Sequence, residues 1–536
     1  MSSKFRKFVM LVMAAAISLS LVGCGNGGSS DDDRTVEVLY TGWNNIAMES
    51  DYDKNPYKKY IDETYDIDYK VSLTADLQNE LAKRFSSSKT RKPDVILFTT
   101  EDYTSMKTLY NQGFFVSDYT PYLAQVPRFA EVFEESAAAK AKLTENGKIV
   151  ALTLPGEEPV WMHKIRKDWV EQYAGGKIPE TVDELLAMAA KVKAADDKQY
   201  LFTGAGENKN FNTLENFQFM FGDYNDWYVK DNAVSHPILD GSREKFLNFM
   251  RTIHQNGYID PNWYTQNWTQ KKINLNGGKV GIDWYPPAIA TDYMFFNNDD
   301  EQNATGIWAN MPMPTDTPGT ARRGAAQSTF RNFIVISADA AKNEEKMGKI
   351  LRLLNDMLYP TDGTAREDSL YMKIRWGLGI DNYMLGEGKE IEPILRDGVD
   401  TGFVTYYYTM NEKNHTRYNY GASWDYGVLM ATTDDRVVEY LNAKQYGQSA
   451  FDYIDLFNDA LEYYAGAQNY NYGEMLNLNA TVQNNLDNLV NEYEITYVLG
   501  TNKLSYAEFV EQWRSYGGDT MKASAESQFR AAGLIR

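Results

Sequence analysis

The sequence predicts an α/β protein in which helices cover a parallel sheet. From residue 35 onward, short apolar runs typical of strands alternate with segments of helical periodicity. The chain has 536 residues, and at roughly 100–200 residues per domain this length predicts more than one domain. Hydrophobic residues make up 43% and charged residues 24%, close to ordinary globular usage, which excludes wholesale disorder.

The first part of the chain reads as strand–helix units. We expect strands at 35–40, 68–73 and 93–98 and helices at 57–64, 77–86 and 106–112. Ligands of such sheets bind outside the carboxyl ends of the strands. Trp43 and Asn44 follow the first strand, and Glu101 and Asp102 follow the third. These residues are therefore expected to face a crevice.

Further strands and helices are expected along the rest of the chain. Strands are predicted at 147–152 and 332–337, a turn and strand at 277–284, and a long amphipathic helix at 340–359. Thr181 with Glu184 three residues later predicts a capped helix start. Residues 501–536 contain two helical stretches around Gly517 and Gly518.

The N-terminus has the pattern of a bacterial lipoprotein signal. Basic residues at positions 4, 6 and 7 precede an apolar run at 8–22, which has the length of a signal peptide and is short for a membrane span. The run ends in Leu-Val-Gly followed by Cys24, a lipobox in which the cysteine accepts the lipid. We therefore expect a signal peptide at 1–23, a lipid such as palmitate on Cys24, and a flexible tether at 24–33.

Composition excludes several kinds of chemistry. Cys24 is the only cysteine, so no intrachain disulfide can form. The four histidines are scattered without metal-ligand spacing, and no phosphate-binding loop or nucleophile motif is present. A net charge of −20, which becomes −23 without residues 1–23, disfavours nucleic-acid partners. We therefore predict no metal, no cofactor and no nucleic acid.

An ordered set of motifs resembles a known family. The set comprises the lipobox, Pro-Asp-Val at 93–95, Gly-Lys-Ile at 147–149, Ile-Arg-Lys-Asp-Trp at 165–169, Pro-Glu-Thr-Val-Asp-Glu-Leu at 179–185, Gly-Lys-Val-Gly at 278–281, Phe-Ile-Val-Ile-Ser at 333–337 and Gly-Gly-Asp at 517–519. In this order they resemble the extracellular solute-binding lipoproteins of bacterial carbohydrate ABC importers, in the large group of roughly 500 residues.

The resemblance implies a two-lobe α/β fold of the periplasmic-binding-protein type. Each lobe would be a sheet flanked by helices, discontinuous in sequence, and the two lobes would be joined by a hinge. We place the N-lobe at 34–152 and 330–400 and the C-lobe at 153–329 and 401–536. The implied partners are a carbohydrate, ABC permease subunits and the outer face of the cytoplasmic membrane, through the lipid anchor. A monomer is expected.

Some relatives carry a calcium loop after the helix that follows the 179–185 motif. Residues 193–200 of this chain read Lys-Ala-Ala-Asp-Asp-Lys-Gln-Tyr. They lack the alternating oxygen ligands and the turn glycine of such a loop. The sequence therefore does not predict calcium there.

Aromatic residues supply the candidate ligand-binding groups. They make up 14% of the chain, and Trp or Tyr faces cover the apolar C–H faces of pyranose rings while polar groups bond the hydroxyls. Ten residues are predicted to bind ligand: Trp43, Asn44, Glu101, Asp102, Trp161, Trp284, Tyr285, Arg331, Trp376 and Trp424. For each single Trp, core packing is the alternative, and Trp169 and Trp513 are expected in the core.

Arg331 and the acidic pairs leave alternatives open. Arg331 lies just before a predicted strand and could bond a ligand or form an internal salt bridge. The pairs 101–102 and 157–158 could act as glycosidase acids only if two carboxyls faced each other across a bond, about 5–9.5 Å apart. Solvated acids are the alternative in a chain this acidic.

The predicted function is capture of a carbohydrate, expected to be an oligosaccharide, in an interlobe cleft, followed by delivery to an ABC importer. No enzymatic activity is expected. Two alternatives remain: a surface lipoprotein glycoside hydrolase or lyase, and a binding protein for a peptide or another non-sugar solute.

Overall fold

The described residues form two compact units, each with its own core. The computed structural model describes residues 34–41, 56–74, 76–86, 90–155, 161–207, 211–285, 307–320, 322, 330–358, 370, 395–396, 399–400, 456, 459–460, 462–464 and 472–536. Unit 1 takes the described residues within 1–156 and 329–436, and unit 2 those within 157–328 and 437–536. The chain therefore passes between the units three times. The lobe boundaries predicted from the sequence remain predictions.

Unit 1 is built on a five-stranded mixed sheet. Its strand order is β2–β1–β3–β12–β6. β1 is parallel to β2 and β3, whereas β12 is antiparallel to β3 and β6. The expected parallel sheet is therefore confirmed for three strands, and β12 makes the whole sheet mixed. The strands are β1 (Thr35–Thr41), β2 (Asp68–Thr74), β3 (Val95–Phe98), β6 (Leu152–Pro155) and β12 (Phe330–Ile336).

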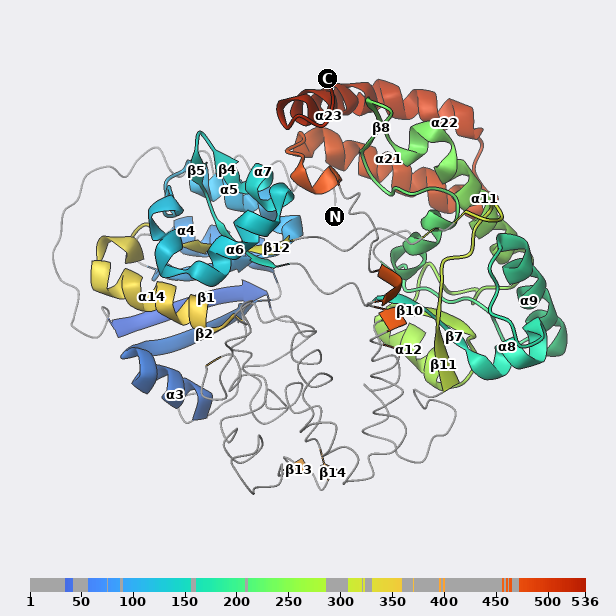
Figure 1. Cartoon of the computed structure of the whole chain (residues 1–536), viewed down its shortest axis with the longest axis horizontal. Coiled ribbons are helices and arrows are strands. Elements are labelled where there is room, and N and C mark those ends of the chain that lie inside the picture. Colours follow the sequence, from blue (N-terminus) through green and yellow to red (C-terminus); the bar gives the residue numbers. More distant parts are fainter. Residues whose placement is uncertain are drawn as a thin grey trace. The chain divides into compact units, whose positions relative to one another are not determined.

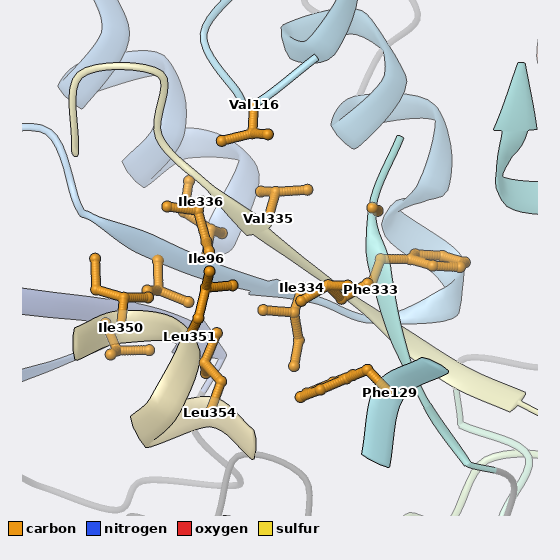
Figure 2. Packing of buried hydrophobic residues seen from close by; sticks show 14 of the residues in the cluster. Ile96, Val116, Phe129, Phe333, Ile334, Val335, Ile336, Ile350, Leu351 and Leu354 are labelled. Atoms are coloured by element: carbon orange, nitrogen blue, oxygen red, sulfur yellow. The ribbon is translucent and has the colours of Figure 1, made fainter. Parts of the chain in front are cut away.

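Helices of unit 1 pack on this sheet through one apolar core. The helices are α3 (Pro56–Tyr65), α4 (Leu77–Ser86), α5 (Tyr103–Asn111), α6 (Pro127–Glu135), α7 (Ala137–Leu143) and α14 (Glu344–Asp356). Figure 2 shows β12 and α14 bringing Val335, Ile336 and Leu351 toward Ile96 of β3. Residues of β12 and α14, which lie about 300 positions later in the sequence, thus complete the core of a unit that begins at residue 34.

Two predicted segments of unit 1 differ from the expectation. The strand predicted at 147–152 is divided into a hairpin strand, β5 (Lys148–Ile149), paired with β4 (Thr144–Glu145), and the sheet strand β6. The helix predicted at 340–359 begins later, because a 3₁₀ turn (Ala340–Lys342) precedes α14 and Asn343 caps it by accepting a hydrogen bond from the Lys346 N–H. A further two-residue pairing joins β13 (Leu395–Arg396) to β14 (Val399–Asp400).

Unit 2 combines a three-stranded sheet with many helices. The sheet order is β10–β7–β11, with both outer strands antiparallel to β7. In Figure 1 the red C-terminal helices α21, α22 and α23 belong with the green elements of this unit. The strands are β7 (Met162–Arg166), β10 (Ile282–Tyr285) and β11 (Trp308–Met311), with a separate hairpin of β8 (Tyr228–Lys230) and β9 (Ala233–Ser235).

The helices of unit 2 come from both ends of the sequence that forms it. They are α8 (Lys167–Ala174), α9 (Val182–Ala195), α10 (Pro237–Asp240), α11 (Ser242–Gln255), α12 (Trp268–Asn276), α21 (Ala480–Val498), α22 (Tyr506–Trp513) and α23 (Asp519–Ala531). The predicted capping box at Thr181 and Glu184 is confirmed. Trp169 and Trp513 are buried in one core cluster, as expected.

Candidate functional site

Half of the ten predicted ligand residues have side chains that the structure describes. These are Asp102, Trp161, Trp284, Tyr285 and Arg331. The predicted residues Trp43, Asn44, Trp376 and Trp424, the lipidation site Cys24 and the side chain of Glu101 lie outside the described part of the chain.

Three of the predicted aromatic residues meet in unit 2. Trp161 precedes β7, and Trp284 and Tyr285 end β10, the antiparallel neighbour of β7. The ring centroids of Trp161 and Trp284 lie 4.6 Å apart with planes 32° apart, and Trp161 lies 5.9 Å from Tyr285. Both tryptophans are half-buried. The strand register therefore joins residues that are more than a hundred positions apart in sequence.

Trp268 extends this group, and the sequence reasoning missed it. Its ring stacks on Tyr285 at 5.7 Å with planes 22° apart. Trp268 opens α12, whose start is fixed by a capping box between Asn267 and Gln270. That Asn-x-x-Gln pattern was the available signal in the sequence. We call Trp161, Trp268, Trp284 and Tyr285 the aromatic platform.

A buried ion pair supports the aromatic platform. Lys271 follows Trp268 by one helical turn, and its Nζ lies 3.7 Å from the Trp268 ring centroid. The same Nζ donates to both carboxylate oxygens of Asp283 at 2.9 and 2.7 Å. Asp283 Oδ1 also accepts from the Trp284 N–H at 3.0 Å. The pair thus ties α12 to the strand that carries two platform rings.

Burial dominates the electrostatics of this pair. Lys271 and Asp283 are 0% and 2% exposed. Loss of solvent lowers the pKa of Lys271 and raises the pKa of Asp283, while their mutual attraction opposes both changes. A second buried amine, Lys164 of β7, lies opposite Asp283 in the sheet, and burial lowers its pKa to about 7. Asp283 therefore pairs with Lys271 and lies opposite Lys164 in the sheet, and all three side chains are buried.

The described polar candidates of unit 1 lie on neighbouring segments at one end of β3. Asp102 ends a 3₁₀ turn (Thr100–Asp102) that follows β3, and its Oδ2 accepts from Thr99 Oγ1 at 2.8 Å. The Asn332 N–H, next to Arg331 in β12, donates to Thr100 Oγ1 at 3.4 Å. The turn that carries Asp102 and the strand segment that carries Arg331 therefore lie side by side.

A bulge in β12 gives Arg331 its position. Asn332 has a φ of 51°, and the pairing of β12 with β6 shifts between Arg331 and Phe333. Thr153 Oγ1 of β6 donates to the carbonyl oxygens of Arg331 and Asn332 at 3.0 and 2.7 Å. The sequence signalled the strand but not the bulge, because a bulge depends on the partner strand.

A cavity of about 130 Å³ lies elsewhere in unit 2. Its walls include Trp227, His236, Trp513 and the buried ion group in which Arg243 donates to Glu215 and Glu494. None of the predicted ligand residues lines it. Burial lowers the pKa of His236 to about 3, so this imidazole is neutral at pH 7.

The described residues offer neither a metal cluster nor a membrane-spanning helix. Within the ranges that the structure describes, no group of three or more His, Cys, Asp or Glu side chains could hold a metal ion. In the loop after α9, the Lys193 ammonium donates to the Asp197 carbonyl at 2.6 Å. No helix in the described part of the chain is long and apolar enough to cross a membrane.

Proteins with related sequences and structures are solute-binding proteins. The family described as bacterial extracellular solute-binding protein matches residues 51–354, more than half of the chain. The polygalacturonan/rhamnogalacturonan-binding protein YtcQ of Bacillus subtilis (strain 168) is 20% identical over 407 residues, which cover 73% of this chain and 76% of YtcQ.

Solved structures of similar fold include two from transporter systems. One is an HMO-binding, ABC-transporter-associated solute-binding protein from Bifidobacterium longum infantis ATCC 15697, with a TM-score of 0.60, 15% identity, and coverage of 92% of this chain and 98% of that chain. The other is the S. pneumoniae ABC-transporter substrate-binding protein FusA, an EF-hand mutant in complex with fructo-nystose, with a TM-score of 0.63, 13% identity, and coverage of 93% and 99%.

These matches decide the fold and the family. The likeness in fold extends over nearly the whole chain and confirms the two-lobe, periplasmic-binding-protein-like architecture expected from the motifs. The motif resemblance is confirmed as well, because the family match covers most of unit 1 and the sheet of unit 2. The chain belongs to the family of bacterial extracellular solute-binding proteins.

Proposed function

We propose that this protein captures a carbohydrate, an oligosaccharide in particular, and delivers it to an ABC importer. The observation that carries the proposal is the aromatic platform, where Trp161 and Trp284 present half-buried rings 4.6 Å apart. The outward side of such an indole pair suits the C–H face of a pyranose ring, which is apolar and needs little electrostatic matching.

The relatives support a carbohydrate as the ligand class. YtcQ is named for binding polygalacturonan and rhamnogalacturonan, and the FusA structure holds fructo-nystose. Lys271, which lies against the Trp268 ring of the platform, is already paired with Asp283, and the chain carries a net charge of −20. Both features favour a neutral sugar over a polyanion at this platform.

The proposed mechanism is hinge closure of the two lobes on the ligand, a recognised switching mode of binding proteins. The platform of unit 2 would stack on the sugar rings. Asp102 and Arg331 of unit 1, together with Trp43, Asn44, Glu101, Trp376 and Trp424, would supply further contacts. Binding and release need no covalent step, so we propose no enzymatic activity.

The proposed location is the outer face of the cytoplasmic membrane. Lipid on Cys24, followed by the tether at 24–33, would hold the protein beside its permease as a monomer. Replacing Cys24→Ser should release the protein from the membrane fraction of expressing cells and abolish incorporation of labelled palmitate. Retention of label in C24S would contradict the anchor.

A ligand screen tests the carbohydrate proposal. Thermal-shift measurements should show a higher melting temperature with one oligosaccharide class and no shift with peptides, because a ligand that binds only the folded state stabilises it. Chromatography of the same mixtures should recover the sugar intact. A shift with peptides alone, or cleavage of the sugar, would favour one of the two alternative functions instead.

A platform variant with a matched control localises the site. Trp284→Ala should weaken sugar binding by about tenfold or more, since stacking and burial of one aromatic ring contribute on the order of 1.5–3 kcal/mol. Tyr516→Ala removes a ring that is 56% exposed on the C-terminal helices and should leave the affinity unchanged. If calorimetry gave the two variants equal affinities for the sugar, the proposal that the aromatic platform binds it would be contradicted.

A further inference from the structure

Three segments of unit 2 lead toward the three crossings between units. Trp161 is the first described residue of unit 2 after the first crossing, and Arg322 is the last before the second. Residues 456–464 contain the first described residues after the third crossing. In a protein that closes by a hinge, segments next to the connections between the moving bodies decide how far the backbone change extends into each body.

Two consecutive tyrosines tie these segments together. Tyr464 Oη donates to the Trp161 carbonyl at 2.9 Å. Tyr463 Oη donates to the Arg322 carbonyl at 2.7 Å and accepts from the Met313 N–H at 3.1 Å. One short helical stretch at 462–464 therefore bonds to the main chain of both other segments.

Each tied segment is also fixed to the body of unit 2. Arg322 Nη1 donates to Asp223 at 2.9 Å. Asn310 Nδ2 of β11 donates to the Leu456 carbonyl at 2.8 Å. Burial raises the pKa of Tyr464, so its hydroxyl keeps the proton that it donates. Trp161 directly precedes β7. The three segments are thus joined to one another and to the body of unit 2.

We propose that Tyr463 and Tyr464 form a clasp that anchors on unit 2 the three segments leading toward the crossings and positions Trp161. The bonds end on main-chain atoms, so they restrain the backbone of each segment independently of its side chains. Tyr464 is a positioning residue: its bond holds the carbonyl of the residue whose indole pairs with Trp284. The part concerning sugar affinity rests on the proposed function, while the part concerning segment anchoring does not.

The first experiment needs no ligand. Two close indoles produce an exciton couplet in circular dichroism, and Trp161→Phe identifies the signal of the Trp161–Trp284 pair. Tyr464→Phe deletes only the hydroxyl and should diminish that couplet. Tyr506→Phe is the matched control, because Tyr506 Oη also donates to a main-chain carbonyl of unit 2, that of Ile238, at 3.0 Å. An unchanged couplet in Y464F, or an equal loss in Y506F, would overturn the positioning role.

The second experiment follows the hinge and the sugar. With one dye on each unit, single-molecule energy transfer should show a broader distribution of open states in Tyr463→Phe than in Tyr506→Phe. For the sugar found by the screen, Y464F should raise Kd about fivefold, while its melting temperature falls no more than that of Y506F. Wild-type distributions and affinities in both clasp variants would overturn the clasp. If Trp284→Ala leaves the affinity for the sugar unchanged while Y464F still alters the couplet, the proposed sugar site is contradicted and the proposed clasp is supported.

Discussion

Removing the charge of Asp283 is the perturbation with the largest expected effect. Asp283→Asn keeps an oxygen that can accept the Trp284 N–H and nearly the same side-chain volume, but it deletes the carboxylate that faces Lys271. Because Lys271 is 0% exposed, water cannot replace the lost partner. The variant therefore leaves an uncompensated buried ammonium.

The magnitude follows from the geometry of the pair. At the 2.7 Å separation of Nζ and Oδ2, the Coulomb attraction is about 6 kcal/mol at an effective dielectric constant of about 20. The cost of removing two ions from water offsets much of it. Breaking a buried pair by deleting one partner costs about 3–5 kcal/mol of unfolding free energy. For a unit of this size that corresponds to a fall of about 6–20 °C in melting temperature.

The assay is calorimetric unfolding of three proteins across pH. Asp283→Asn should be the least stable at pH 7, and the double variant Lys271→Met, Asp283→Asn should recover most of the loss because both charges of the buried pair are then removed. The deficit of the single variant should shrink as pH rises toward 10.5, the unperturbed value for lysine. Burial lowers the folded pKa of Lys271, so the folded state holds fewer protons and gains stability with pH.

Two outcomes would refute this reasoning. A loss under about 1 kcal/mol in the single variant would mean that solvent reaches Lys271. A double variant as unstable as the single one would mean that packing, and not charge, accounts for the effect.

Two further changes test local features. Thr181→Ala should lower the free energy of unfolding, measured by denaturant titration, by about 1 kcal/mol, because it deletes the hydroxyl that accepts the Glu184 N–H. Thr181→Ser keeps that hydroxyl and should keep the stability. An alanine variant as stable as the wild type would contradict the stabilising role of the cap. Burial lowers the pKa of His163 to about 3, so its stabilising contribution is present above the unfolded value of 6.5 and is lost as pH falls from 6.5 toward 3. Between pH 7 and pH 5, the free energy of unfolding of His163→Leu should fall by about 2 kcal/mol less than that of the wild type. If the unfolding free energies of the two proteins changed in parallel with pH, the buried neutral imidazole would be contradicted.

Local elements were predictable because their signals are local. The alternation at 35–40, the capping box at Thr181 and Glu184, and the apolar faces around Trp169 and Trp513 all specify structure within a few residues. The structure bears them out with small shifts of bounds. The prediction of one strand at 147–152 was wrong. Asn146 and Gly147 take positive φ and form the turn of a hairpin between β4 and β5, so the sheet strand β6 begins only after this hairpin.

The site was only partly accessible to the same reasoning. Trp161 and Trp284 were predicted as ligand residues, Trp284 because it lies at the end of a predicted strand, yet nothing near them in sequence indicated that they pair with each other. Lys271 would be assigned to solvent from its sequence alone, since an isolated lysine is rarely buried. Its burial depends on Asp283, twelve positions away and on a different element.

The α/β class and the elements with strong local signals thus follow from the order of residues, because hydrophobic periodicity, caps and turns act over one or two turns of chain. The family followed from the resemblance of an ordered set of motifs. The platform, the mixed sheet and the tyrosine clasp follow only from the tertiary structure. Tyr464 meets Trp161 across 303 positions and β12 enters between β3 and β6. Such pairings are selected by sheet register and by burial of a whole core, which are properties of the folded chain and of no single segment.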